Sequence, residues 1–182
     1  NALAGAYIGH LFGLSPEEIE TGIHSLQPVT GRNHLIETDT LMILDDCYNA
    51  NPASMRASLD VLALATGRRV AVMGDMKELG ENEEQLHFET GEYAARKGID
   101  TIVCIGPLAC QMYLGAKNLA SGNTVLHYTG KKEFLHDLPS LFEAGDTVLV
   151  KASNSMKFSE IVEALTEFEA NTKDEIEKGA KQ

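Results

Sequence analysis

The chain has 182 residues, of which 23% are charged, and its formal net charge is −12. This length has room for one main hydrophobic core, and the excess of acids leaves no broad basic surface for nucleic acid or anionic lipid. No apolar run approaches the roughly 20 residues of a membrane-spanning helix, and the first residues lack the pattern of a secretory signal, so we expect a cytoplasmic protein with no membrane insertion.

Two short helices are predicted at the start of the chain. Residues 1–12 have helical spacing of apolar side chains and are followed by Gly13. Ser15, Pro16 and Glu18 then form the pattern of a capping box with proline at the first helical position, which predicts a second helix to about residue 25. The turn-rich stretch 27–31 follows, and beyond it the apolar residues change from helical spacing to extended runs. We place a domain boundary there.

After this boundary, short extended runs alternate with helical stretches. The predicted strands cover residues 35–37, 41–44, 70–73, 101–105, 124–128 and 147–150. The predicted helices cover residues 52–65, 83–97, 107–119, 132–142 and 155–168. Such alternation favours an α/β, Rossmann-like fold: a mostly parallel sheet of about six strands, with helices on both faces and two short helices before it. Residues 171–182 are charged and poor in apolar side chains, so no packed structure is expected for them.

The stretch from Leu41 to Met55, LMILDDCYNANPASM, has the profile of a buried strand, a polar loop and a helix. Asp45 and Asp46 would stand where the strand emerges, and Asn51 would cap a helix whose first residue is Pro52. Two further polar loops, GDMKELG from Gly74 and KASNSMK from Lys151, also follow predicted strands. Because the carboxyl ends of parallel strands share one edge, we expect these loops to form a ligand-binding rim.

Each of these residues also has a plainer interpretation. Adjacent acids on a strand point in opposite directions, so one of Asp45 and Asp46 is expected to cap the loop through backbone amides and the other to be solvated. Asn49 and Asn51 suit turn and cap roles. The charged residues of the GDMKELG loop are expected to be solvated, and a surface ion pair is the commoner role for Arg32.

The serines of the third loop leave two possibilities open. Ser153 and Ser155 precede a predicted helix, whose free amides could hold a carboxylate or phosphate, or one serine could be an ordinary cap. Neither the six histidines nor the three cysteines show metal-ligand spacing, so we expect reduced thiols, no metal site, and a surface or capping role for His87. The chain also lacks a GxGxxG motif and a phosphate-binding GxxxxGK[ST] loop.

Taken together and in this order, the strings LDDCYNANPASM, GDMKELGE and VLVKASNSMKF closely resemble the carboxyl-terminal domain of the Mur ligases. Within that family they resemble the branch that adds D-alanyl-D-alanine to UDP-N-acetylmuramoyl-tripeptide in peptidoglycan synthesis. The resemblance implies that residues 1–28 end a central ATPase domain, that 29–170 form the Rossmann-like carboxyl-terminal domain, and that 171–182 are a charged tail. It also implies that the protein's own central domain, which carries the phosphate-binding loop, and its own N-terminal domain, which holds the UDP-sugar, lie upstream, so that this chain by itself would be inactive.

The resemblance implies ATP and Mg²⁺ as cofactors, with the magnesium ligands outside this chain. ATP would phosphorylate the tripeptide's terminal carboxylate, and the amine of D-alanyl-D-alanine would then attack the acyl phosphate. Asn1 resembles a residue that contacts adenine, Arg32 one that reaches ATP phosphate, and Asp46 one that holds the ribose. The residues implied for the dipeptide and the reacting groups are Asn49, Asn51, Lys151, Ser153 and Ser155. No residue is assigned as catalytic.

The sequence departs from the family pattern in two loops. Ala152 and Asn154 stand where the family usually has glycine and arginine, so another residue would hold the dipeptide's carboxylate, or the accepted dipeptide would differ. Cys47 replaces a hydroxyl residue.

Two alternative functions remain open. The first is a phosphoacceptor receiver module, suggested by Asp45, Asp46 and Lys151, although the third acid that such a module needs is missing after residues 101–105. The second is a stand-alone binding domain.

Overall fold

The structure is a computed structural model that describes residues 2–25, 30–119 and 122–167. Asn1 and the charged tail 171–182 lie outside the described residues, as does part of the predicted boundary at 27–31. Six strands form one sheet: β1 (His34–Glu37), β2 (Met42–Asp45), β3 (Arg69–Gly74), β4 (Thr101–Ile105), β5 (Thr124–Tyr128) and β6 (Thr147–Lys151). The helices are α1 (Ala2–Leu11), α2 (Pro16–His24), α3 (Pro52–Leu62), α4 (Glu83–Arg96), α5 (Ala109–Leu119) and α6 (Lys131–Leu141), and residues 159–167 are also helical.

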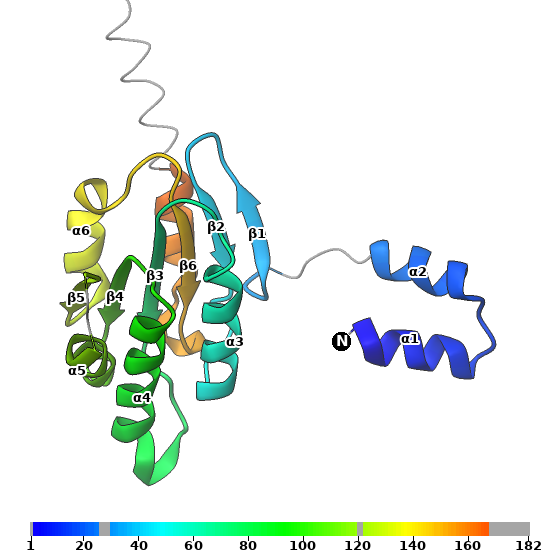
Figure 1. Cartoon of the computed structure of the whole chain (residues 1–182), viewed down its shortest axis with the longest axis horizontal. Helices are drawn as coiled ribbons and strands as arrows, with labels where there is room; N and C mark the ends of the chain where they lie inside the picture. Colours follow the sequence, from blue (N-terminus) through cyan, green and yellow to red (C-terminus); the bar gives the residue numbers. More distant parts are fainter. Residues whose placement is uncertain (1, 26–29, 120–121, 168–182) are drawn as a thin grey trace, which may run out of the picture.

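The strand order is β1-β2-β6-β3-β4-β5 (Figure 1). β1 pairs antiparallel with β2, and every other neighbouring pair is parallel. β4 is buried along its whole length, as expected for a parallel strand covered on both faces. The predicted mostly parallel sheet is therefore confirmed. β2, β6 and β3 are neighbours, so the loops that follow them meet at one edge.

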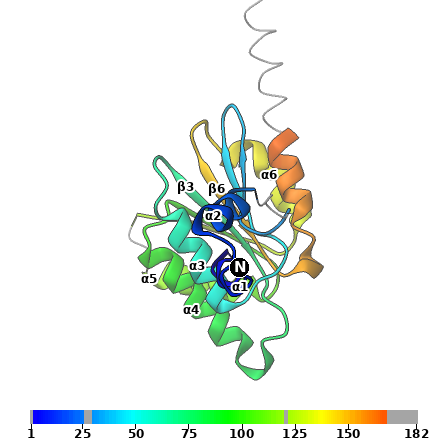
Figure 2. The same cartoon turned by 90° about the vertical axis from the view of Figure 1, so that its right-hand side faces the viewer.

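Alternate residues of each strand enter two different cores. Ala71 and Met73 of β3 pack with α3, α4 and α5, whereas Val70 and Val72 pack with α6 and the 159–167 helix. Figure 2 shows α3, α4 and α5 on one side of the sheet and α6 with the 159–167 helix (orange) on the other. Helices on both faces were predicted, and the side chains that form both cores are buried.

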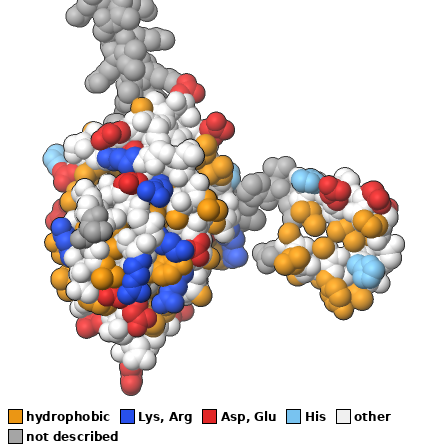
Figure 3. Space-filling model, in the orientation of Figure 1, with side chains coloured by type: hydrophobic (Ala, Val, Ile, Leu, Met, Phe, Trp, Pro, Cys, Tyr) orange, Lys and Arg blue, Asp and Glu red, His pale blue; other side chains and the backbone are white. Residues whose placement is uncertain are grey.

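α1 and α2 pack on each other, apart from the sheet (Figure 1). The predicted capping box is present, since Glu18 N donates to Ser15 Oγ at 3.2 Å and Ser15 N donates to Glu18 Oε2 at 2.8 Å. Large apolar side chains of this pair, including Leu3 and Phe12, are exposed. Figure 3 shows hydrophobic side chains (orange) gathered on the surface of this pair. Within the described ranges, no helix is long and apolar enough to cross a membrane.

The predicted start of the last helix, residue 155, is wrong. Residues 154–156 form a 3₁₀ turn, Lys157 is left-handed with φ +51°, and the helix begins at residue 159. The left-handed residue interrupts the helical path, which the apolar spacing alone did not predict. Consequently Ser153 and Ser155 do not stand at the amino terminus of an α-helix, and no side-chain cap is formed at Ser153.

Candidate functional site

The three polar loops lie together at the carboxyl edge of the sheet, as predicted. Residues 46–51 follow β2, residues 75–80 follow β3, and residues 152–158 follow β6, and these three strands are neighbours in the order β2-β6-β3. Backbone and side-chain hydrogen bonds connect the second and third loops: Ser153 N donates to Asp75 O at 3.1 Å, and Lys77 N donates to Ser153 Oγ at 2.8 Å. The rim is thus one connected surface.

Asp45 holds the segment before β1 against the sheet. Its Oδ2 accepts a hydrogen bond from Gly31 N at 2.8 Å and its Oδ1 accepts one from Cys47 N at 3.3 Å. Tyr48 N in turn donates to Gly31 O at 2.9 Å. Asp45 is 1% exposed, so it has the predicted backbone-capping role.

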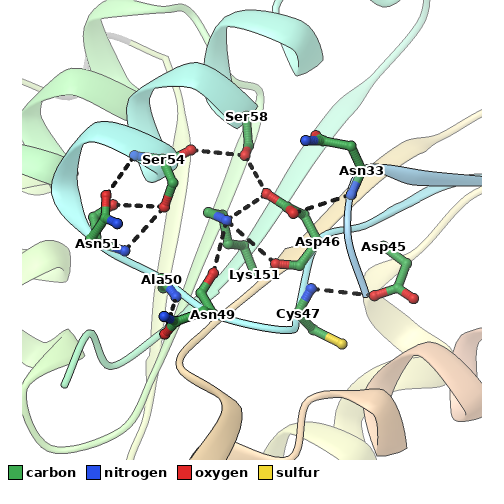
Figure 4. Close-up of polar contacts among 10 residues, drawn as sticks. All are labelled: Asn33, Asp45, Asp46, Cys47, Asn49, Ala50, Asn51, Ser54, Ser58 and Lys151. Atoms are coloured by element: carbon green, nitrogen blue, oxygen red, sulfur yellow. Dashed lines mark hydrogen bonds and ion pairs between the residues drawn. The ribbon is translucent and has the colours of Figure 1, made fainter. Parts of the chain in front are cut away.

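Asp46 belongs to a buried network and is not solvated, contrary to the simpler expectation. Its Oδ2 accepts from Lys151 Nζ at 2.5 Å and from Ser58 Oγ at 2.6 Å, and its Oδ1 accepts from Asn33 N at 3.2 Å (Figure 4). Lys151 Nζ also donates to Asn49 O at 3.0 Å. The side chain of Lys151 is 2% exposed, so its burial is compensated by this ion pair and these hydrogen bonds.

The two asparagines of the first loop use their side-chain oxygens locally. Asn49 Oδ1 accepts from Ala50 N at 2.8 Å. Asn51 Oδ1 accepts from Ser54 N at 2.8 Å, while Asn51 N donates to Ser54 Oγ at 3.1 Å, so the predicted cap of α3 is confirmed (Figure 4). Both residues remain exposed, and their side-chain NH₂ groups are the parts left for a ligand.

The loop after β3 is held more tightly than the sequence suggested. Asp75 is fully buried: its Oδ1 accepts from Ala109 N at 2.8 Å, where α5 begins, and its Oδ2 accepts from Lys77 Nζ at 2.8 Å. His87 is buried too, with Nε2 accepting from Met76 N at 2.9 Å and Nδ1 donating to Glu83 O at 2.6 Å. Solvation of Asp75 and a surface position for His87 were therefore wrong expectations, because contacts between distant segments bury both.

The candidate residues line two adjacent hollows that share Tyr48, Asn49 and Asn51. The first, which we call the arginine hollow, has a volume of about 230 Å³ and includes Arg32, Asp46 and Lys151. The second, which we call the serine hollow, has a volume of about 420 Å³ and includes Lys77, Ser153 and Ser155. The structure thus separates the implied ATP-binding residues Arg32 and Asp46 from the two serines.

Arg32 lines the arginine hollow, next to Tyr48, which both hollows share. Its guanidinium carbon is 4.0 Å from the centroid of the Tyr48 ring, and both side chains are exposed. Such a stack at an exposed site is weak, about 0.5–1 kcal/mol. An anion in the arginine hollow could therefore draw Arg32 away from the Tyr48 ring at little cost in free energy. The surface ion pair expected for Arg32 is not among the ion pairs of the described residues.

Backbone strain also gathers at this rim. Outside glycine, the described residues with positive φ are Asn33 (+47°), Glu78 (+63°) and Lys157 (+51°). Asn33 lines the arginine hollow, Glu78 lines the serine hollow, and Lys157 ends the third loop. Residues in this region cost about 1 kcal/mol or more each and persist where the surroundings hold them, which is common at ligand sites.

The rim does not offer a metal site or an activated thiol. Among the described residues, no group of three or more His, Cys, Asp or Glu side chains could hold a metal ion. Burial and the neighbouring Asp45 raise the pKa of Cys47 to about 12, so this thiol is not a nucleophile at neutral pH. A receiver module needs acids gathered around a metal, whereas the carboxylates of Asp45 and Asp46 are held by different partners.

Comparison with known proteins identifies the family. The family profile described as "Mur ligase, glutamate ligase domain" matches residues 31–154. The UDP-N-acetylmuramoyl-tripeptide–D-alanyl-D-alanine ligases of Bacillus subtilis and Escherichia coli are each 38% identical over 170 residues, which cover 92% of this chain and 37% and 36% of those proteins.

Solved structures agree. MurF from Acinetobacter baumannii matches 91% of this chain and 36% of its own, with a TM-score of 0.79 and 31% identity. The MurF ligase from Thermotoga maritima in complex with ADP also matches 91% of this chain and 36% of its own, with a TM-score of 0.76 and 27% identity. The chain thus spans about a third of the length of these relatives. On this evidence, it belongs to the Mur ligase family and corresponds to the carboxyl-terminal part of its MurF members.

Proposed function

We propose that this chain is the domain that binds D-alanyl-D-alanine and closes over ATP in a ligase that joins this dipeptide to UDP-N-acetylmuramoyl-tripeptide. The observation that carries the proposal is the pair of adjacent hollows on one rim. One contains Arg32, Lys151 and Asp46, and the other is lined mostly by neutral hydroxyls and amides, beside Lys77 and Glu78. The dipeptide's amine must attack an acyl phosphate that forms at the γ-phosphate of ATP, so the sites for ATP and the dipeptide need to be neighbours. The names of the relatives supply the substrates.

In the proposed reaction, ATP transfers its γ-phosphoryl group to the tripeptide's terminal carboxylate. The amine of the dipeptide then attacks the carbonyl carbon of this acyl phosphate, the C–O bond to phosphate breaks, and an amide forms with loss of a proton. Positioning and charge stabilisation supply most of the catalysis in such transfers. Closure of this domain would exclude water that could hydrolyse the acyl phosphate.

In the arginine hollow, Arg32 would leave Tyr48 and bind a phosphate oxygen of ATP. Asp46 would accept a ribose hydroxyl through Oδ1, which has one protein donor, at 3.2 Å, and can accept a second. Lys151 would act mainly by fixing Asp46 and the Asn49 carbonyl, since its ammonium already donates to both. Adenine contact by Asn1 remains a prediction outside the described residues.

The serine hollow would hold the dipeptide, with Ser153 and Ser155 as its hydroxyl groups and Asn49 and Asn51 between the two ligands. Mg²⁺ would partly neutralise the phosphates of ATP, but the described residues provide no carboxylate set that fits it, so no step here depends on a metal. Because ATP and a nucleotide-linked precursor are the substrates, we place the reaction in the cytoplasm.

Titration of the ¹⁵N-labelled chain, followed by amide chemical shifts, tests this proposal. D-alanyl-D-alanine should shift the amides of residues 77–79 and 153–155, whereas ADP should shift those of residues 32–33 and 46–49. L-alanyl-L-alanine is the matched control and should shift them much less. Equal effects of the two enantiomers, or shifts confined to the opposite end of the sheet near Thr38 and Gly145, would contradict it. Labelling of Asp45 or Asp46 by acetyl phosphate would instead favour the receiver alternative.

A further inference from the structure

The serine hollow contains one cation among many neutral groups. Of the described side chains that line it, only Lys77 and Glu78 are charged. The neutral polar side chains there are those of Asn49, Asn51, Ser153, Asn154 and Ser155. Asn154 occupies the position where the resemblance led us to expect an arginine, so a carboxylate entering this hollow meets no guanidinium. Among the described residues that line this hollow, Lys77 is the only lysine or arginine that could bind the carboxylate instead.

The structure holds Lys77 in a fixed position. Its backbone N–H donates to Ser153 Oγ at 2.8 Å, and the preceding residue, Met76, donates its N–H to the buried His87. Its ammonium donates to Asp75 Oδ2 at 2.8 Å, and Asp75 is itself held by Ala109 N. A lysine that is anchored at both the backbone and the ammonium loses less conformational freedom when it binds a ligand.

The ammonium of Lys77 is nevertheless free to bind a second anion. An ammonium has three N–H donors, and hydrogen bonding to Asp75 uses one of them. The Lys77 side chain is 40% exposed, whereas Asp75 is fully buried, so the ligand approaches the cation and not the carboxylate. Glu78 is exposed at the same hollow, which disfavours a ligand with anionic groups at both ends.

We infer that Lys77 binds the terminal carboxylate of the acceptor dipeptide and so selects a free acid over a neutral end group, with Asp75 as the residue that positions its ammonium. This inference rests on the proposed function, since it takes the dipeptide as the occupant of the serine hollow. A charge-assisted hydrogen bond from a partly exposed lysine should favour the free acid over its amide by about tenfold in affinity.

The test compares two ligands and three variants. The dissociation constants of D-alanyl-D-alanine and D-alanyl-D-alaninamide are measured by amide chemical shifts for the wild-type chain, Lys77→Gln, Lys77→Arg and the control Lys132→Gln. Lys132 is exposed on α6, and its replacement changes the net charge by the same amount. The wild type, Lys77→Arg and Lys132→Gln should prefer the free acid by about tenfold. Lys77→Gln should bind the two ligands equally, with its affinity for the amide unchanged.

The outcomes separate the inference from the proposed function. If Lys77→Gln keeps the tenfold preference while the dipeptide still shifts residues 153–155, the inference about Lys77 is wrong and the dipeptide site stands. If the wild type itself shows no preference for the free acid, the inference is wrong as well. If neither ligand shifts the serine hollow of the wild type, the proposed function fails with it. Unchanged affinity for the amide in Lys77→Gln shows that the loop is still folded.

Discussion

Two Asp–Lys ion pairs lie at the rim, Asp46–Lys151 and Asp75–Lys77, and they differ in burial. In Asp46–Lys151 the lysine side chain is 2% exposed, and its ammonium also donates to Asn49 O. In Asp75–Lys77 the acid is fully buried and the lysine is 40% exposed. The first pair fixes the rim, because its cation has no open side. The second presents its cation to a hollow, and the buried acid serves as its support.

The comparison predicts its largest effect for Lys151→Met. This change leaves the carboxylate of Asp46 buried without its cation, which should lower the free energy of unfolding by about 4 kcal/mol. Urea unfolding followed by circular dichroism measures it, with Lys132→Met on exposed α6 as the control, expected within about 0.5 kcal/mol of the wild type. A loss below about 1 kcal/mol for Lys151→Met would contradict a structural role for this pair.

Gly106→Ala should have the next largest effect, because the added Cβ would displace Asp75, the buried acid of the Asp75–Lys77 pair. A Cβ at Gly106 would lie 2.4 Å from Asp75 Oδ1, and φ is +124° there. Asp75 would have to leave Ala109 N, and we expect a loss of about 3 kcal/mol. Gly98→Ala is a matched control, since its φ is +68° but nothing lies within 4 Å of the added Cβ, and it should cost about 1 kcal/mol. Equal losses in the two variants would show that Asp75 can move freely.

Lys77→Met should destabilise the chain less than Lys151→Met does. Its removal leaves Asp75 with the Ala109 hydrogen bond and opens a path for water to Oδ2, so a loss of about 1–2 kcal/mol is expected. The same urea titration measures it. If Lys77→Met and Lys151→Met cost the same, the distinction between a supporting pair and a presenting pair is not valid.

Tyr48→Leu should have the smallest effect, on the wall between the two hollows. It removes the stack with Arg32, which contributes about 0.5–1 kcal/mol at an exposed site. The Nε–H resonance of Arg32 reports the contact directly, because the aromatic ring shifts it. Tyr48→Phe should keep the wild-type resonance position and Tyr48→Leu should lose the ring shift. An unchanged Arg32 resonance in Tyr48→Leu would mean that the stack is not formed in solution.

Local sequence was sufficient for several elements of this site. The cap of α2 needs Ser15 and Glu18, and the cap of α3 needs Asn51 and its neighbours, all within three residues of one another. The convergence of the three loops also followed from the sequence, because alternating strands and helices imply a parallel sheet whose strand ends share an edge. The family resemblance rested on the same loops, and the comparisons confirmed it.

The errors concerned burial and pairing. Asp46 lies 105 positions before Lys151, and Asp75 lies 34 positions before Ala109. The sequence presents each of them as a charged loop residue, for which solvation is the common outcome. The late start of the last helix was missed for a similar reason, since the third loop is held by Lys77 and Asp75 from a different segment.

The sequence by itself thus determined which residues begin helices, which runs form strands, and which loops reach the rim, because hydrogen bonds within one turn and the spacing of apolar residues decide those features. Only the tertiary structure decided that Asp46 and Lys151 fix the rim while Asp75 supports an exposed Lys77. The physical reason is that the exposure of a charged group depends on what the folded chain packs over it. Segments far apart in the sequence supply that cover.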